Sequence, residues 1–245
     1  MAKHNSGGAK GKDLPVFQIN SAFPRPDAAL IARFAQLPAA NISDAAGNLN
    51  TMDSSIQALQ PGWKICGPAC TVSTRAGDFL AILHGLQLAQ PGDVLVISNQ
   101  ANPDVAVFGE ITSTEARLKG LAGLVTDGRV RDSEGIRKLG FPVFARGTTP
   151  RVAGRGSLGE VNVPVSCGGV VVEPGDVIVA DADGVVVVPR LKAPQILRLA
   201  ENILNFEEDL VGKVRQGMSQ VEFFKLDEQF QALSTAHQKG HGKQD

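Results

Sequence analysis

Tyrosine is absent from this sequence of 245 residues, which contains one tryptophan and three cysteines. Cys66, Cys70 and Cys167 are too few for the disulfide framework of a small secreted protein, so we expect a protein of the reducing cytoplasm. Cys66 and Cys70 are spaced CxxxC, but neither a second pair nor a nearby histidine completes a zinc site. We therefore expect the cysteines to be buried, apolar side chains.

An excess of either charge is also missing, because 24 Lys and Arg residues face 25 Asp and Glu residues, a formal net charge of −1. Nucleic-acid-binding domains carry clustered, uncompensated basic residues. No apolar run approaches the roughly 20 residues of a membrane-spanning helix, and the start of the chain, MAKHNSGGAKGKD, lacks the apolar stretch of a signal peptide. We expect no nucleic-acid partner, no membrane association and a disordered tail over residues 1–13.

Short runs rich in valine and isoleucine predict β-strands in the middle of the chain. Helical patterns closed by glycine or Pro-Gly occur among them, over residues 78–90 and 111–120. This alternation is typical of a layered α/β protein, and the later strands, which no helix interrupts, predict a β-rich layer. The sequence thus predicts one α/β core domain over residues 14–190. The predicted strands are residues 94–97, 123–126, 142–145, 169–172, 177–180 and 185–188.

A long helix is predicted after Pro189, because apolar residues recur there at alternating spacings of three and four. Gly212 and Gly217 are expected to end or interrupt it, and a second helical piece follows over residues 219–233. These helices form a predicted C-terminal arm over residues 191–245, which either covers the core or embraces a neighbouring subunit. The apolar stripe consists of Ile196, Leu199, Ile203, Phe206 and Leu210.

The stretch DGRVRDSEG, residues 127–135, places several charges after the apolar run GLVT. Charges at the exit of a buried strand form either a ligand site or a solvated loop. In a solvated loop, Asp127 would pair with Arg129, and Arg131 with Asp132. In layered α/β proteins, ligands gather at the carboxyl ends of strands, so the spacing alone leaves both interpretations open.

Glu110 ends a second apolar run, VAVFGE, and a helix is expected to begin at about Thr112. Gly109 lets the backbone turn tightly and approach a ligand, and free N–H groups at a helix start favour a carboxylate or phosphate. The guanidinium of Arg131 suits a carboxylate or an enolate. Asp132 offers oxygen to a hard divalent cation, with Glu110 as a second carboxylate, directly or through a water.

Residues from about 40 to 190 resemble the divalent-metal-dependent pyruvate aldolases that cleave 4-hydroxy-4-methyl-2-oxoglutarate and 4-carboxy-4-hydroxy-2-oxoadipate, a family that also contains the regulator of ribonuclease activity A. The active-site signature of the family, an acid, twenty intervening residues and Arg-Asp, falls on Glu110, Arg131 and Asp132. Single pieces are weak, but the ordered set is specific. The matching stretches are ISDAAG (42–47), GPACTV (67–72), AQPGDVLVI (89–97), FGEITSTEARLKGLAGLVTDGRVRD (108–132), LGFPVFARG (139–147) and VPVSCGGVVVEPGDVIVADADGVVVVP (163–189).

The resemblance implies a swivelling β/β/α core and a role for each residue of the signature. Asp132 would ligate Mg²⁺ or Mn²⁺, Glu110 would hold a water on the metal, and Arg131 would contact the pyruvyl oxygen. The sequence departs from the family at Glu110, where the aldolases often have aspartate. A longer acid can shift the water and with it the substrate range.

The resemblance also implies how substrate and subunits are arranged. The backbone N–H groups of Ile111 and Thr112, next to Gly109, would receive the pyruvate carboxylate. The family assembles as homotrimers or as hexamers built from two trimers, with active sites at subunit interfaces. A carboxylate from the C-terminal helix of a neighbouring subunit enters each site, and Glu207 or Glu208 could serve here.

These roles predict a lyase, a class II pyruvate aldolase or oxaloacetate decarboxylase, which cleaves a C–C bond of a 2-keto acid to give pyruvate through an enolate. The alternative is a non-catalytic binding protein that regulates a ribonuclease or helicase. Asp132 favours the lyase, because the regulator branch lacks this residue and a pure regulator has no use for a metal ligand. Arg155 either reaches a second substrate carboxylate or is a solvated loop residue.

Overall fold

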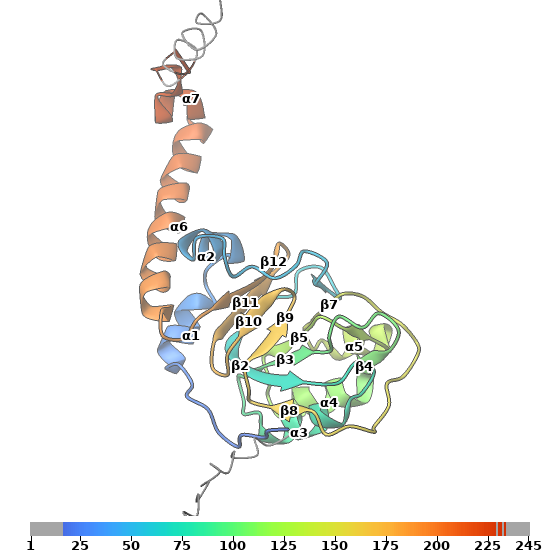
Figure 1. Ribbon diagram of the computed structural model, residues 1–245. Helices are drawn as coiled ribbons and strands as arrows, with labels where there is room; N and C mark the ends of the chain where they lie inside the picture. Colours follow the sequence, from blue (N-terminus) through green and yellow to red (C-terminus); the bar gives the residue numbers. More distant parts are fainter. Residues whose placement is uncertain (1–16, 229, 232, 234–245) are drawn as a thin grey trace, which may run out of the picture.

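The computed structural model describes residues 17–228, 230, 231 and 233 (Figure 1). The tail predicted over residues 1–13 therefore lies outside the described residues, as does the end of the C-terminal arm from residue 234. Within the described part of the chain, no helix is both long and apolar enough to cross a membrane.

An eight-stranded sheet forms the centre of the molecule (Figure 1). Its strands are β1 (Gln57–Ala58), β2 (Ile65–Ser73), β3 (Val94–Ser98), β5 (Gly123–Thr126), β7 (Val143–Ala145), β8 (Glu160–Val161), β11 (Val177–Asp181) and β12 (Gly184–Val188). β7, β5, β3 and β2 run parallel in that order, while β1, β8, β11 and β12 pair antiparallel with their neighbours. The end strands β1 and β12 also approach each other, so the sheet is nearly closed like a barrel.

Valine and isoleucine dominate these strands because both faces of the sheet are covered. Every residue of β3, β5, β11 and β12 is buried, and strands covered on both faces have continuous apolar sequences. The six strands predicted from the sequence are confirmed, each boundary within one residue, when β7 and β10 (Val170–Val172) are included.

Three helices cover one face of the sheet: α3 (Leu80–Leu88), α4 (Glu110–Leu118) and α5 (Ser133–Leu139). Their apolar side chains join those of the strands in one core, where Leu86 and Ile136 are fully buried. The two helices predicted from the glycine-closed patterns are therefore confirmed, although α3 is shorter at both ends than its pattern.

The opposite face carries the predicted β-rich layer. β9 (Val165–Cys167) and β10 form a two-stranded antiparallel sheet. Together with Met52 and Ile56 they pack on the central sheet around Phe144. The α/β fold class, with its β-rich layer, is thus confirmed.

The sequence PGDV occurs twice, and each copy opens a strand, as the Pro-Gly pair predicts. Gly92 and Gly175 both adopt φ of 87°, the left-handed conformation that glycine permits in a turn. The aspartates that follow are buried and stabilise the turns: Asp93 accepts the amide of Gln90 at 2.8 Å, and Asp176 accepts the amide of Glu173 at 2.9 Å.

Helices α1 (Ala28–Phe34), α2 (Ala39–Ala45) and α6 (Ala193–Arg215) pack on β11 and β12. The first two turns of α6 contribute buried residues to this core, and Phe34 and Ile42 meet them there fully buried. The C-terminal arm therefore begins as a cover of the core, which was one of its two predicted roles. The buried residues of α6 are Ala193, Ile196, Leu197 and Ala200.

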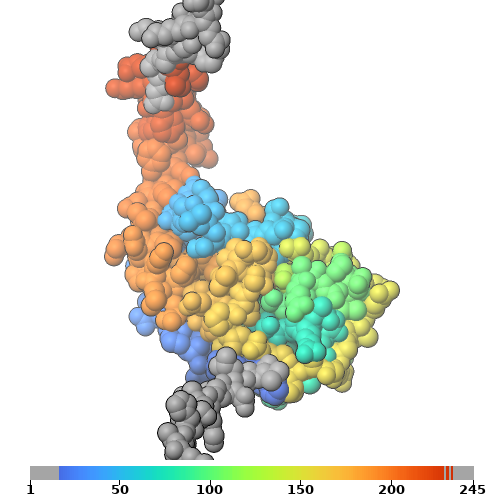
Figure 2. All heavy atoms as spheres, viewed as in Figure 1, coloured from blue at the N-terminus to red at the C-terminus, as the bar shows by residue number. Residues whose placement is uncertain are grey.

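The outer half of α6 stands away from the core (Figures 1 and 2). The prediction that Gly212 ends or interrupts the helix is wrong, because the helix continues to Arg215 and turns only at Gly217, with φ of 100°. One glycine costs a helix only about 1 kcal/mol relative to alanine. α7 (Gln220–Phe224) opens the predicted second helical piece, which is interrupted at Lys225 with φ of 52°. The described residues beyond it, 226–228, 230, 231 and 233, are again helical. Exposed apolar residues on this part of the arm are Phe206, Val211, Val214, Met218, Val221 and Phe224.

All three cysteines are free, with Cys70 and Cys167 buried and Cys66 half-buried. Burial raises the pKa of the Cys66 and Cys70 thiols to about 12. Protonated thiols are poor metal ligands, so the expected structural role of the cysteines agrees with their surroundings.

Candidate functional site

Two short parallel strands bring the halves of the sequence signature together. β4 (Ala106–Phe108) leads through one residue into Glu110, and β6 (Arg129–Val130) leads into Arg131 and Asp132. The amide of Arg131 extends the ladder by donating to the last carbonyl of β4 at 2.9 Å. Parallel strands end at the same edge of a sheet, so residues far apart in the sequence become neighbours here.

The charged stretch follows β5 directly, but a turn and β6 lie within it and separate β5 from Arg131 and Asp132. Asp127 belongs to that turn: it is buried and accepts the amides of Asn99 and Ala101 at 2.7 and 3.2 Å. Burial raises the pKa of Asp127, and these amides offset part of the rise. Arg129 donates to the carbonyl of Thr148 at 3.3 Å instead of pairing with Asp127. One of the two ion pairs of the solvated-loop interpretation is thus not formed.

The other ion pair is formed. Nε of Arg131 lies 3.2 Å from Oδ2 of Asp132, and the two side chains are 37% and 40% exposed. The same Oδ2 accepts the amide of Glu110 at 3.3 Å. An exposed ion pair contributes at most about 1 kcal/mol to stability, so this contact explains little about why the charges are there. Oδ1 of Asp132 makes no hydrogen bond with any described residue.

Asp132 adopts an unusual backbone conformation just before α5, with φ of 55° and ψ of 38°. This left-handed region is strained for residues other than glycine, and such strain clusters at functional sites. The side chain does not cap α5. It contacts Arg131 and the amide of Glu110 instead, so the strained backbone directs the carboxylate to the β4 side of the site.

Glycine at position 109 is explained by the lack of space for a side chain and not by the backbone conformation. Its φ of −151° is extended, so the expected tight turn at this residue is not present. A Cβ at position 109 would lie 2.7 Å from Oδ2 of Asp132 and 3.1 Å from Cγ of Arg131. The missing side chain therefore leaves room for the Arg131–Asp132 pair.

Helix α4 begins at Glu110, two residues earlier than predicted. The cause is the Thr112 hydroxyl, which accepts the amide of Gly109 at 3.0 Å and lies 2.9 Å from its carbonyl oxygen, and so caps the helix. The amides of Ile111 and Thr112 lie in the first turn, where helical geometry supplies no carbonyl partner. Such amides are available to an anion, and the cradle itself stays a prediction.

The predicted substrate-binding residues line one hollow of about 110 Å³, which we call the β4/β6 hollow. Arg155 lies on its wall, with the guanidinium 4.8 Å from the ring centroid of Phe79. Arg131 also lines a second hollow of about 300 Å³ together with Asp132. The residues that offer polar groups to the β4/β6 hollow, through backbone or side chain, are Gly109, Ile111, Thr112, Arg131 and Arg155.

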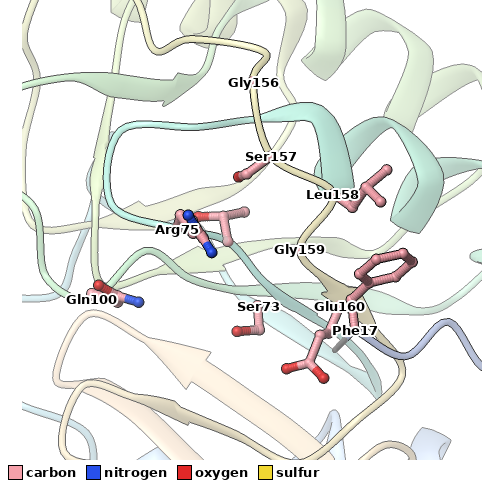
Figure 3. A pocket seen from close by; sticks show the side chains of 10 residues that line it. Phe17, Ser73, Arg75, Gln100, Gly156, Ser157, Leu158, Gly159 and Glu160 are labelled. Carbon is pink, nitrogen blue, oxygen red and sulfur yellow. The ribbon is translucent and has the colours of Figure 1, made fainter. Parts of the chain in front are cut away.

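A larger hollow of about 450 Å³ lies at the carboxyl ends of β2 and β3, and we call it the β2/β3 hollow (Figure 3). Arg75 and Gln100 line it from these strand ends, Ser157 from the loop that leads to β8, and Glu160 from the start of β8. Among the described residues, Arg75 has no ion-pair partner. None of the signature residues lines this hollow.

Asp78, which the sequence analysis missed, fastens the loop between the two hollows. The buried carboxylate accepts the amides of Leu80, Gly156 and Ser157 at 2.9, 2.5 and 2.8 Å. Burial tends to raise the pKa of Asp78, but these amides outweigh it and hold the pKa below its ordinary value. Arg155 precedes the fastened residues directly. An aspartate just ahead of a helical pattern was the available signal, since such residues bind backbone amides.

The residues at the site fit a hard divalent cation. Within the described part of the chain there is no group of three or more His, Cys, Asp or Glu residues that could hold a metal. Mg²⁺ needs fewer, because one or two carboxylates suffice when water and substrate oxygens complete the shell. Asp132 offers the free Oδ1, and Glu110 is exposed beside it.

A model of the RraA-like family, described as Aldolase/RraA, matches residues 39–187, more than half of the chain. The chain belongs to the RraA-like aldolase family. Both the predicted resemblance and the predicted fold are thereby confirmed. The matched residues include β4, β6 and the complete signature, whereas α6 lies beyond them.

Relatives within this RraA-like family carry two kinds of name. The chain is 41% identical over 171 residues to a "Putative 4-hydroxy-4-methyl-2-oxoglutarate aldolase" of Halalkalibacterium halodurans, covering 70% of this chain and 81% of that protein. It is 35% identical in sequence to Streptomyces coelicolor RraAS2, "an unusual member of the RNase ES inhibitor RraA protein family". The crystal structure of that protein matches with a TM-score of 0.70 over 76% of this chain and 98% of that chain. An uncharacterised protein of Pseudomonas syringae pv. tomato has a TM-score of 0.74 at 28% identity, with coverage of 81% and 93%.

Proposed function

We propose that this RraA-like protein is a divalent-metal-dependent lyase that cleaves a C–C bond of a 2-keto acid and releases pyruvate through an enolate. The observation that carries the proposal is the meeting of β4 and β6, which gathers an acid, an arginine and a metal-binding aspartate beside the first turn of α4. The relative named as a putative 4-hydroxy-4-methyl-2-oxoglutarate aldolase supports this reaction class.

The substrate would bind by its keto-acid end in the β4/β6 hollow. The amides of Ile111 and Thr112 receive the carboxylate, because first-turn amides at a helix start favour an anion. The guanidinium of Arg131 then lies at the keto oxygen, where negative charge gathers as the enolate forms. Gly109 leaves the space in which these groups approach one another.

Asp132 would hold Mg²⁺ or Mn²⁺ through its free Oδ1, and Glu110 would act through a water. The bound cation supplies Lewis acidity at the keto group. Glu110 orients the water that takes the proton from the C4 hydroxyl as the C3–C4 bond breaks, and the proton returns to C3 to complete pyruvate. Oxaloacetate would lose CO₂ by the same bond cleavage and give the same enolate.

Arg155 would bind a second carboxylate of the substrate. It lines the same hollow as Arg131, and its guanidinium is held over Phe79. Two arginines in one hollow match a dicarboxylate, and both 4-hydroxy-4-methyl-2-oxoglutarate and oxaloacetate carry a second carboxylate. Arg155 is exposed, as the solvated interpretation also expects, and its place beside Arg131 supports the substrate-binding interpretation.

The active assembly would be a homotrimer or a hexamer, with residues 14–190 as the catalytic core and residues 191–245 as an arm that reaches a neighbour. The exposed apolar side chains on the outer half of α6 support such a contact. Of the two carboxylates considered for a neighbouring site, Glu207 is bound by Asn41 of its own chain at 2.5 Å. Glu208 is exposed and makes no hydrogen bond or ion pair with a described residue, so we propose Glu208.

Regulation of a ribonuclease without catalysis is the second candidate, which the RNase ES inhibitor family named for the Streptomyces relative supports. Asp132 argues against it as the sole function, because a strained backbone conformation is maintained there to place a carboxylate beside Arg131.

The test is release of pyruvate from a panel of 4-hydroxy-2-oxo acids and oxaloacetate, with Mg²⁺ and after chelation. We expect activity that depends on the metal and on Asp132. Activity that survives both chelation and Asp132→Ala would contradict the proposed reaction. Inactivity on the whole panel together with inhibition of a ribonuclease would support the regulator instead.

A further inference from the structure

Gly135, in the first turn of α5, lies directly against the Glu110 side chain. A Cβ built at position 135 would be 2.8 Å from Oε1 of Glu110 and closer still to Cδ and Oε2. All three of its nearest neighbours belong to this one carboxyl group, and none is backbone. The carboxylate of Glu110 therefore occupies the space that a side chain at position 135 would take.

The backbone gives no other reason for glycine at this position. Gly135 is not among the residues with positive φ, and glycine is disfavoured within helices because it loses more conformational entropy than alanine. By contrast, Gly140 at the end of the same helix has φ of 72°, which accounts for glycine there. What distinguishes position 135 is its contact with Glu110.

We propose that Gly135 is a positioning residue for Glu110, so that the two form a size-complementary pair. This inference rests on the proposed function, in which Glu110 orients the water that moves the proton. Because the neighbouring atoms are the end of one flexible side chain, a Cβ at position 135 would displace the Glu110 carboxyl group and leave the backbone in place. An aspartate at position 110 is one methylene shorter and leaves room for alanine at position 135.

Gly109 and Gly135 both leave space that the charged side chains of the proposed site occupy. Gly109 leaves space for Asp132 and Arg131, and Gly135 leaves space for Glu110. The metal-binding aspartate and the proton-handling acid are thus placed by separate glycines on different elements. A change at position 135 moves one acid and leaves the Arg131–Asp132 contact in place.

The test is a double-mutant cycle of Gly135→Ala and Glu110→Asp, with kcat, KM and Mn²⁺ affinity measured for each variant. Displacing a group that acts through the metal shell costs about 10- to 100-fold in activity or metal affinity. We expect Gly135→Ala to lower kcat about 10-fold with KM within about 2-fold, and to weaken Mn²⁺ binding. Adding Glu110→Asp to Gly135→Ala should recover most of the lost kcat and Mn²⁺ affinity.

A stability measurement provides a readout that needs no activity. When Glu110→Ala removes the carboxyl group, adding Gly135→Ala should raise Tm by about 1–3 °C, since alanine is the better helix former. In the chain with Glu110 the same change should raise Tm less or lower it. Gly212→Ala is the matched control, because it lies within α6 with nothing within 4 Å of an added Cβ, and it should leave kcat unchanged.

The outcomes separate this inference from the proposed function. An active wild type whose kcat and Mn²⁺ affinity are unchanged by Gly135→Ala would overturn the pairing and leave the lyase proposal standing. Failure of Glu110→Asp to restore Gly135→Ala, when both variants fold, would also overturn it. If the wild type releases no pyruvate from any substrate, the lyase proposal fails, and the Tm differences still decide whether the two positions are coupled. If Gly135→Ala does not fold, recovery of folding by Glu110→Asp supports the pairing and its absence contradicts it.

Discussion

The two hollows on either side of the loop from Arg155 to Ser157 differ in size and in chemistry. The β2/β3 hollow has about 450 Å³, and the β4/β6 hollow about 110 Å³. The larger one sits at the ends of the long central strands, where ligands of layered α/β proteins often bind. The smaller one sits at the end of two short strands, and Arg131 and the first turn of α4 line it, whereas no signature residue lines the larger one.

Strained backbone also occurs near both hollows, although Asp132 lines the neighbouring hollow of about 300 Å³ and adjoins the β4/β6 hollow through Arg131. The two cases differ in what accounts for the strain. Gln100 and Ala101 beside the larger hollow have φ of 54° and 53°. The Asp127 carboxylate accepts the amides of Ala101 and the preceding Asn99, so the strain there belongs to a braced turn. At Asp132 only Oδ2 is braced, by the amide of Glu110 and by Arg131, while Oδ1 makes no hydrogen bond with a described residue and stays available to the proposed cation. The proposed site therefore rests on convergent side chains and not on the volume of a hollow.

Of the substitutions considered, removing Asp132 should lower the rate of pyruvate release most. Asp132→Ala should lower kcat/KM for pyruvate release by roughly 10³-fold, or about 4 kcal/mol, since the cation then loses its carboxylate ligand. Glu134→Gln is the control, because Glu134 is exposed, carries the same charge and pairs only with Lys138 at 3.0 Å. Equal losses for both variants would mean that net charge, and not the position of Asp132, matters.

Replacing one arginine in each hollow compares the contributions of the two hollows to kcat. Arg131→Gln should lower kcat roughly 10²- to 10³-fold, as expected for loss of a donor to a developing oxyanion. Arg75→Gln in the β2/β3 hollow should leave kcat within about 2-fold, because Arg75 meets none of the signature residues. Steady-state kinetics of both variants check this prediction. A reversed order of effects would place the chemistry in the larger hollow.

Arg155 should determine which substrates bind, without affecting the chemical step. Arg155→Gln should raise KM about 10-fold for dicarboxylates, because one charge-assisted hydrogen bond is lost. The kcat should stay nearly constant. A 4-hydroxy-2-oxo acid with a neutral group at C4 should show no change in KM. If KM rises equally for both substrates, Arg155 supports the loop and does not contact a carboxylate.

Asp78 gives the smallest effect and one that depends on pH. The amides of Leu80, Gly156 and Ser157 stabilise the charged carboxylate and lower its pKa in the folded protein. Its stabilising contribution is therefore complete above the ordinary pKa of 3.8 and is lost as the pH falls through the lower folded value. Asp78→Asn should lower Tm at pH 7 by roughly 2–4 °C.

This difference in Tm between wild type and Asp78→Asn should shrink as the pH falls below about 4. Thermal unfolding followed from pH 7 to pH 3 measures it. A constant difference across this range would show that ionisation of Asp78 does not fasten the loop.

The long strands and covering helices could be predicted because they carry strong periodic signals. β3, β5, β11 and β12 are buried on both faces, so their sequences are continuous apolar runs. The pairing of β4 with β6 could not be predicted in this way, because β6 has two residues and its register depends on contacts across the sheet.

The site residues could be named from the sequence, but their geometry could not. The signature placed Glu110, Arg131 and Asp132 together, while the left-handed backbone of Asp132 and the spatial role of Gly135 depend on tertiary contacts. Gly212 shows the reverse error: a local signal for a helix end is overridden, because one glycine costs little in a helix of 23 residues.

The most direct measurement is titration of Mn²⁺ by electron paramagnetic resonance, with oxalate as a mimic of the pyruvate enolate. Wild type and Arg75→Gln should bind Mn²⁺ alike, and oxalate should tighten binding in both, since cation and enolate mimic occupy the site together. Asp132→Ala should lose Mn²⁺ binding and the response to oxalate. Unchanged Mn²⁺ binding by Asp132→Ala, or its loss in Arg75→Gln, would contradict a metal site at the β4/β6 edge.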